Sequence, residues 1–202
     1  PDTANPLFLF KFVPVKRISD MKTISLPENF DIEQRAQSAR QNFLDGYNCC
    51  QAVLLAFQDI WGTDEKTIAT IASGFGGGMA RMREVCGTVS AMGMAAGFIS
   101  PAIRPKNMEE RTANYALVQE LAGEFRKENG SIICRELLGL DRKPSAAAGQ
   151  PASETKTEVR EIEPPRPSDR TPEYYRKRPC PELVACSARI IARKLAALSD
   201  AQ

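Results

Sequence analysis

The chain has 202 residues, of which 43% are hydrophobic, and this is enough for one compact core. Its 27 basic and 25 acidic side chains leave a net charge of +2, which predicts neither a nucleic-acid partner nor attraction to an anionic membrane. The histidine count is zero, which excludes Ser-His and Cys-His dyads, histidine-ligated zinc and histidine-ligated haem.

The first 20 residues show no helical pattern of apolar side chains. Their short apolar run, Leu7 to Phe10, is broken by Lys11 and follows no basic segment, so it does not resemble a secretory signal. Met21-Lys22 resembles an ordinary translation start. We therefore expect residues 1–20 to be a disordered extension, and the protein to be cytoplasmic with reduced thiols.

Residues 21–140 have the periodicity and capping residues of a helical core. The predicted elements are helices over 31–45, 48–61, 63–74, from 86 onward, over 107–130 and over 131–139, with a glycine-rich loop at 74–78. The stretch 85–103 is uncharged and almost long enough to span a membrane. Because it contains three glycines, a proline and no leucine, it predicts a buried core helix and no membrane span.

The composition changes after residue 140. Residues 141–178 are dominated by Pro, Ser, Ala and charged side chains, which predicts a long mobile connection. The region 179–202 then predicts a last helix beginning at Cys180-Pro181, with proline at the first helical position. The expected fold is all-α: a compact bundle of about six helices, with a glycine-rich loop and a charged connection before the helix that completes the core.

Four of the six cysteines fall at predicted helix starts. They are Cys49, Cys86, Cys134 and Cys180. A helix N-terminus offers unpaired N–H groups and partial positive charge, which favour the thiolate that attacks disulfides and binds metals. The alternative is that they are small buried residues, as most free cysteines are. Cys50 and Cys186 lie in apolar helical stripes, which predicts core packing for both.

The loop Gly74-Phe75-Gly76-Gly77-Gly78-Met79 does not fit a nucleotide site. It lacks the third glycine of the dinucleotide motif, follows no predicted strand and precedes no Gly-Lys-Ser/Thr. Its glycines predict a close approach of the backbone to another helix or to a cofactor. We expect Gly76, Gly77, Gly78 and, beside Cys86, Gly87 to contact the cofactor.

Several short motifs occur in a recognisable order. They are Gly46-Tyr47-Asn48-Cys49, Gln51-Ala52-Val53-Leu54, the glycine-rich loop, Glu84-Val85-Cys86-Gly87, Cys134-Arg135-Glu136-Leu137-Leu138-Gly139 and Cys180-Pro181-Glu182-Leu183-Val184. In this order they resemble the C_GCAxxG_C_C family of redox-active proteins, over about residues 31–198 without the charged connection.

The resemblance implies that the four family cysteines are Cys49, Cys86, Cys134 and Cys180. The central motif departs from the family pattern, since Val85 and Ser90 replace glycines and Gly87 replaces alanine. The domain also resembles the non-haem part of split-Soret cytochromes, for which an iron–sulfur centre has been proposed. This chain has no Cys-x-x-Cys-His, so no haem is expected.

Three functions follow as hypotheses. The first is electron transfer through an all-cysteine iron–sulfur site, which would serve a redox partner protein. The second is a metal-free thiol–disulfide or redox-sensing protein, which requires distant cysteines to meet in space. The third is a structural zinc site in an interaction module, disfavoured because paired Cys-x-x-Cys knuckles are absent. If a site exists, Cys49, Cys86, Cys134 and Cys180 should converge on it.

Overall fold

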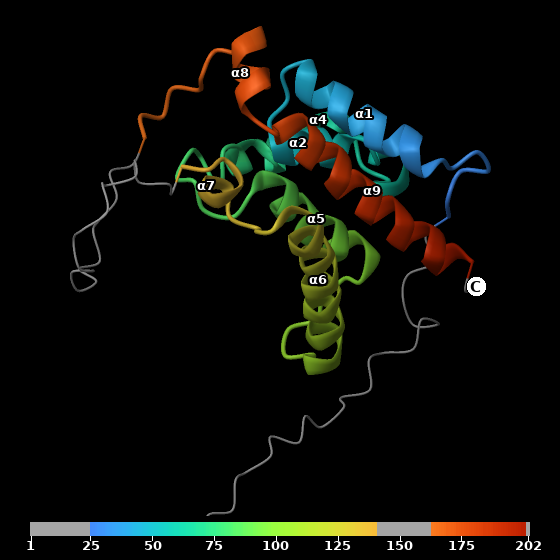
Figure 1. Cartoon of the computed structure of the whole chain (residues 1–202). Helices are drawn as coiled ribbons and strands as arrows, with labels where there is room; N and C mark the ends of the chain where they lie inside the picture. Colours follow the sequence, from blue (N-terminus) through green and yellow to red (C-terminus); the bar gives the residue numbers. More distant parts are fainter. Residues whose placement is uncertain (1–24, 141–162, 201–202) are drawn as a thin grey trace, which may run out of the picture.

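The computed structural model describes residues 25–140 and 163–200. The predicted N-terminal extension and residues 141–162 of the predicted connection lie outside these ranges. The described residues form nine α-helices and no β-strand, which confirms the all-α prediction. Figure 1 shows the first and last helices lying side by side along one edge of the molecule.

This pairing of α1 (Ile32–Leu44) with α9 (Cys180–Ser199) joins the two ends of the described chain. The side chain of Asp31 caps α1 by accepting a hydrogen bond from the backbone N–H of Gln34, as the predicted helix start requires. Small buried residues, Ala39 on α1 and Ala188 on α9, have no exposed surface. Such residues let two helix backbones approach closely, so the last helix completes the core.

The helix predicted over 48–61 is two helices. They are α2 (Cys49–Leu55) and α3 (Gln58–Trp61). The indole Nε1 of Trp61 donates to the carbonyl of Leu54 at 3.0 Å, and the guanidinium of Arg35 donates to the carbonyl of Ala56 at 2.8 Å. A continuous helix needs both carbonyls for its own i→i−4 bonds. At the break these two side chains therefore satisfy carbonyls that a continuous helix would use for itself.

The next two helices follow the predicted order with shifted ends. Asp64, rather than Thr63, caps α4 (Glu65–Ile71), and a 3₁₀ turn, η2 (Ser73–Phe75), follows it. Helix α5 (Gly87–Ile99) is the predicted buried helix. Its 13 residues rise about 20 Å, too short for a bilayer. Within residues 25–140 and 163–200, no helix is both long and apolar enough to cross a membrane.

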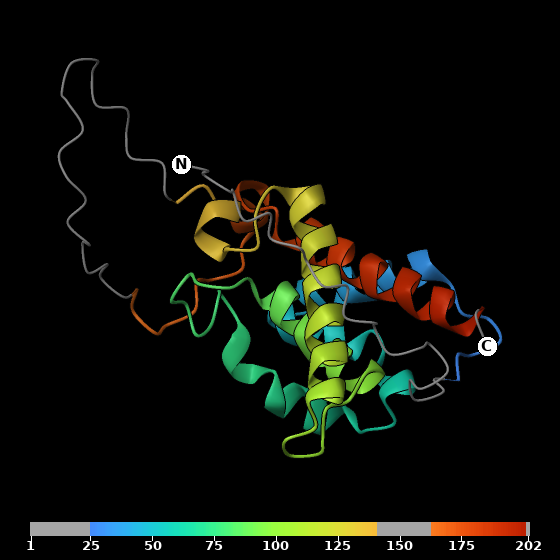
Figure 2. The same ribbon diagram turned by 90° about the horizontal axis from the view of Figure 1, so that it is seen from below.

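The longest helix, α6 (Met108–Asn129), begins and ends where its capping residues predict. Asn107 accepts a hydrogen bond from the N–H of Glu110, and Gly130 closes the helix in the left-handed conformation. The short helix α7 (Cys134–Leu137) follows. Figure 2 shows α6 crossing over α5 and α9, on which it packs.

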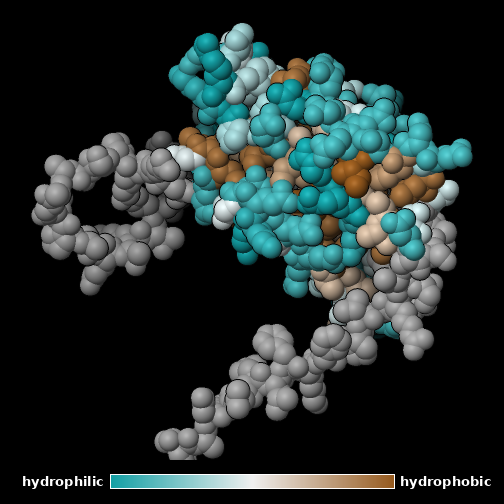
Figure 3. Space-filling model, turned by 45° about the vertical axis from the view of Figure 1, so that its right-hand side comes forward, coloured by the Kyte–Doolittle hydropathy of each residue, from teal (hydrophilic) through white to brown (hydrophobic). Residues whose placement is uncertain are grey.

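Residues 163–178, which composition assigned to a mobile connection, pack on the helices and include α8 (Pro172–Lys177). Composition did not predict this helix, because its partners lie far away in sequence. The guanidinium of Arg170 lies 4.3 Å from the ring centre of Phe43, and the ring of Tyr175 packs edge-on against the same side chain. The face of the molecule drawn in Figure 3 is mostly hydrophilic, and its hydrophobic patches are small and scattered.

Candidate functional site

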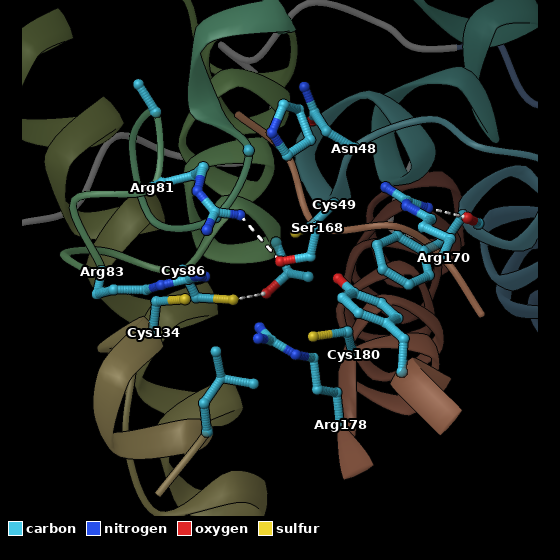
Figure 4. A pocket seen from close by; sticks show the side chains of 18 of the residues that line it. Asn48, Cys49, Arg81, Arg83, Cys86, Cys134, Ser168, Arg170, Arg178 and Cys180 are labelled. Carbon is cyan, nitrogen blue, oxygen red and sulfur yellow. Dashed lines mark hydrogen bonds between the residues drawn. The ribbon is translucent and has the colours of Figure 1, made fainter. Parts of the chain in front are cut away.

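Four cysteines line one cavity of about 880 Å³. Cys49, Cys134 and Cys180 are the first residues of α2, α7 and α9, and Cys86 is the N-cap of α5. The prediction that these four stand at helix starts is therefore confirmed. Figure 4 shows Cys86 and Cys134 on one side of the cavity and Cys180 on the other.

Asn48 positions Cys49. Its side-chain oxygen accepts hydrogen bonds from the backbone N–H groups of Cys50 and Gln51, at 2.9 and 3.0 Å, and so caps α2. Its side-chain nitrogen donates to the carbonyls of Ala72 and Ser73, at 3.1 and 3.0 Å. One side chain thus holds the start of α2 against the segment that leads into the glycine-rich loop.

Two extended segments hold Cys86 and Cys134 next to each other. Val85 and Ile133 form an isolated antiparallel bridge. The N–H of Cys86 donates to the carbonyl of Ile132 at 2.9 Å, and the N–H of Cys134 donates to the carbonyl of Glu84 at 2.7 Å. Backbone hydrogen bonds thus join the two segments that lead into α5 and α7, and they fix Cys86 beside Cys134. The sequence did not predict this pairing.

The glycines have two different roles at the cavity. Gly76 and Gly77 border it, as the cofactor prediction requires. At Gly78, which has φ +70°, an added Cβ would lie 2.6 Å from the Cβ of Cys134. At Gly87 an added Cβ would lie 2.6 Å from the carbonyl oxygen of Phe75. Gly78 and Gly87 thus allow protein segments to pack against the cysteine-bearing backbone, and they do not border the cavity.

The family comparison agrees with this arrangement. The model of the family described as "Putative redox-active protein (C_GCAxxG_C_C)" matches residues 47–194, which include all four cavity cysteines. The chain belongs to this family. No curated protein and no solved structure matches the chain.

In this C_GCAxxG_C_C protein the buried thiols do not have the lowered pKa values that their helix-start positions predicted. Burial raises the pKa of Cys180 to about 12, and repulsion from Cys49 and Cys134 adds to the increase. Burial likewise raises the pKa of Cys86 and of Cys134, although a hydrogen bond from Arg83 opposes the increase at Cys134. Desolvation is the largest influence on each of these three thiols, and they keep their protons at neutral pH.

The other two cysteines lie in the core, as their apolar stripes predicted. Cys50 is fully buried, its sulfur is 3.8 Å from that of Met94, and burial raises its pKa to about 12. The sulfur of Cys186 contacts Glu128 and Asn129. Neither residue borders the cavity.

Sequence reasoning missed the charged wall of the cavity. Five arginines line it, namely Arg81, Arg83, Arg166, Arg170 and Arg178. Arg81 and Arg83 both bind the carboxylate of Glu163, at 2.7 and 2.6 Å. Two sequence signals could have indicated this wall: the Arg-x-Arg pair shortly before Cys86, and Arg178 two residues before Cys180. Arg178 did not stand out in the sequence because many other charged residues surround it.

The residues at the cavity bear on which metal group it could hold. Within the described ranges, no group of three or more Cys, Asp or Glu side chains is placed to hold one ion. Four cysteines from four separate helices line one space, and thiolates are the ligands that iron–sulfur clusters use. A cluster contains several metal atoms and therefore bridges ligands over a wider volume than one ion does.

Proposed function

We propose that this protein transfers electrons through an iron–sulfur cluster held by Cys49, Cys86, Cys134 and Cys180. The observation that carries the proposal is the shared cavity of these four thiols, each supplied by the start of a different helix. A bound cluster would supply one-electron chemistry through ligands that need no histidine.

The surroundings of the thiols support this proposal. Ligation requires deprotonated sulfur, so cluster binding would release the protons that burial keeps on Cys86, Cys134 and Cys180. The negative charge of a four-thiolate cluster would then face the arginines of the cavity wall. Arg83 already donates a hydrogen bond to Cys134 and would stabilise that thiolate. Electrons would pass to a redox partner protein.

A metal-free dithiol is the second candidate, and the arrangement of Cys49 favours it. Cys49 is partly exposed and borders the same cavity as buried Cys86, and it lies close enough for its charge to raise the pKa of the Cys86 thiol. If the two sulfurs come within bonding distance, they form one disulfide, which releases two protons and passes two electrons to an oxidised partner.

Anaerobic purification decides between these functions. The test combines an absorption spectrum before and after dithionite with analysis of iron, inorganic sulfide and zinc. We expect equal amounts of iron and sulfide and a visible absorption that dithionite bleaches. Cys134→Ser should remove both, whereas the matched control Cys50→Ala should retain both, because Cys50 lies outside the cavity.

Failure to bind iron and sulfide after anaerobic reconstitution would contradict the cluster proposal. Mass spectrometry of the oxidised protein then tests the second candidate. A disulfide joining Cys49 to Cys86 would support thiol–disulfide chemistry, and four free thiols after oxidation would contradict it.

A further inference from the structure

One guanidinium in the cavity has no polar partner in the described part of the chain. Arg178 forms neither an ion pair nor a hydrogen bond with any residue of 25–140 or 163–200. In Figure 4 its guanidinium points into the space between Cys180 and Cys134. Glu163 is close enough to feel its charge, but that carboxylate is already bound by two other arginines.

Aromatic packing holds Arg178 in place without using its N–H groups. Its guanidinium carbon lies 4.8 Å from the ring centre of Tyr174. Tyr174 meets Tyr175 edge-on, with ring centres 5.3 Å apart, and Tyr175 packs on Phe43 at 6.2 Å. A guanidinium fixed by stacking keeps its planar set of donors free for a ligand and loses little conformational entropy on binding.

The other cavity arginines are occupied. Arg81 and Arg83 hold Glu163, and Arg170 donates to two backbone carbonyls at the end of α1 and in the following turn. Arg166 lies 3.9 Å from the carboxylate of Asp169 and is largely exposed. Among the described residues, the five guanidiniums at the cavity are thus accompanied by two carboxylates, those of Glu163 and Asp169.

The shape and lining of the cavity indicate what this charge would bind. A volume of about 880 Å³ suits a small organic molecule, for which protein sites measure roughly 300–1,000 Å³. Leu137, Leu138 and Leu183 provide apolar wall beside the thiols. A single planar guanidinium matches a carboxylate through two parallel hydrogen bonds.

From these observations we propose that the cavity binds a small organic carboxylate, with its carboxylate on Arg178 and its apolar part against the leucines, next to the four cysteines. The interpretation of this ligand as the substrate of the centre rests on the proposed redox function. Binding itself depends only on Arg178 and the cavity wall.

The test is calorimetric titration of the anaerobically purified full chain with benzoate. Benzamide, which has the same shape without the charge, is the matched ligand. We expect benzamide to bind at least tenfold more weakly than benzoate. Arg178→Gln should weaken benzoate binding at least tenfold, and Arg178→Lys should weaken it less. Arg176→Gln, which removes the same charge from exposed α8, should change it less than threefold.

Equal binding of benzoate and benzamide, or unchanged binding by both Arg178 variants, would overturn the proposal. Inorganic phosphate binding as tightly as benzoate would overturn the carboxylate assignment. Circular dichroism of each variant confirms that it is folded. If Arg178→Gln does not fold, the comparison of Arg178→Lys with the wild-type chain still tests the proposal.

The cysteine variants separate this proposal from the previous one. Benzoate binding that persists in Cys134→Ser supports the ligand site even if no cluster is found in any preparation. The opposite result is also informative. If the wild-type chain does not bind benzoate and Arg178→Gln changes the cluster spectrum, then Arg178 balances the charge of the cluster. That result would overturn the ligand site but not the cluster proposal.

Discussion

Replacing Gly78 by alanine tests how closely the glycine-rich loop packs on the cysteine site. The left-handed backbone at φ +70° costs an alanine roughly 1–2 kcal/mol. The new Cβ would also lie 2.6 Å from the Cβ of Cys134 and 2.9 Å from the backbone nitrogen of Glu84. Relieving such overlaps costs about 1–3 kcal/mol. The two effects together predict a loss of about 2–5 kcal/mol in the free energy of unfolding.

Two other glycines provide matched controls. Gly139 has nearly the same backbone angle, φ +67°, but nothing lies within 4 Å of an added Cβ. Gly139→Ala should therefore lose only the backbone contribution, roughly 1–2 kcal/mol. Gly93 lies inside α5, also with nothing within 4 Å, so Gly93→Ala should gain about 0.5–1 kcal/mol from its higher helix propensity.

Urea unfolding of the three variants at pH 7, followed by circular dichroism, measures these differences. If Gly78→Ala is no less stable than Gly139→Ala, the loop relaxes away from Cys134 without cost, and the argument from close packing is refuted. Iron content gives a second readout, because displacement of Cys134 should lower it in Gly78→Ala and leave it unchanged in both controls.

Three further changes test the surroundings of the cavity and the core. Glu163→Gln should lower stability by about 1 kcal/mol at pH 7. Arginine pairing lowers the pKa of Glu163, so its contribution is fully present above the unfolded pKa of about 4.3 and is lost as the pH falls through the lower folded pKa; urea unfolding should show a smaller difference at pH 3.5 than at pH 7. Trp61→Phe should cost about 0.5–1.5 kcal/mol by thermal or urea unfolding, because it removes the 3.0 Å hydrogen bond from the indole to the carbonyl of Leu54, which keeps only the bond from the N–H of Phe57. Alkylation of Cys180 by iodoacetamide in the metal-free protein, followed by mass spectrometry, should still accelerate above pH 9, since its pKa is about 12; a plateau below pH 9 would show a stabilised thiolate.

Local signals in the sequence determined most of the helices. The capping residues Asp31, Asn48 and Asn107 and the terminal Gly130 mark helix ends in the structure as they do in the sequence. These signals succeed because a cap satisfies backbone groups of its own helix within three or four residues. The same signals placed four cysteines at helix starts, and their order identified the family before any contact was known.

Only the tertiary structure decided the remaining features, because each depends on partners that are distant in sequence. The break after α2 comes with the hydrogen bond from Arg35 to the carbonyl of Ala56, and residues 163–178 pack on Phe43 in α1 and on Arg81 and Arg83, which follow the glycine-rich loop. Helix-start positions predicted stabilised thiolates, but burial, which the sequence does not report, reverses the pKa shift at Cys180. The cavity, and the position in it of Arg178, which has no polar partner among residues 25–140 and 163–200, exist only once four helices and the segment before α9 have packed together, because both are properties of the space between elements and of no element alone.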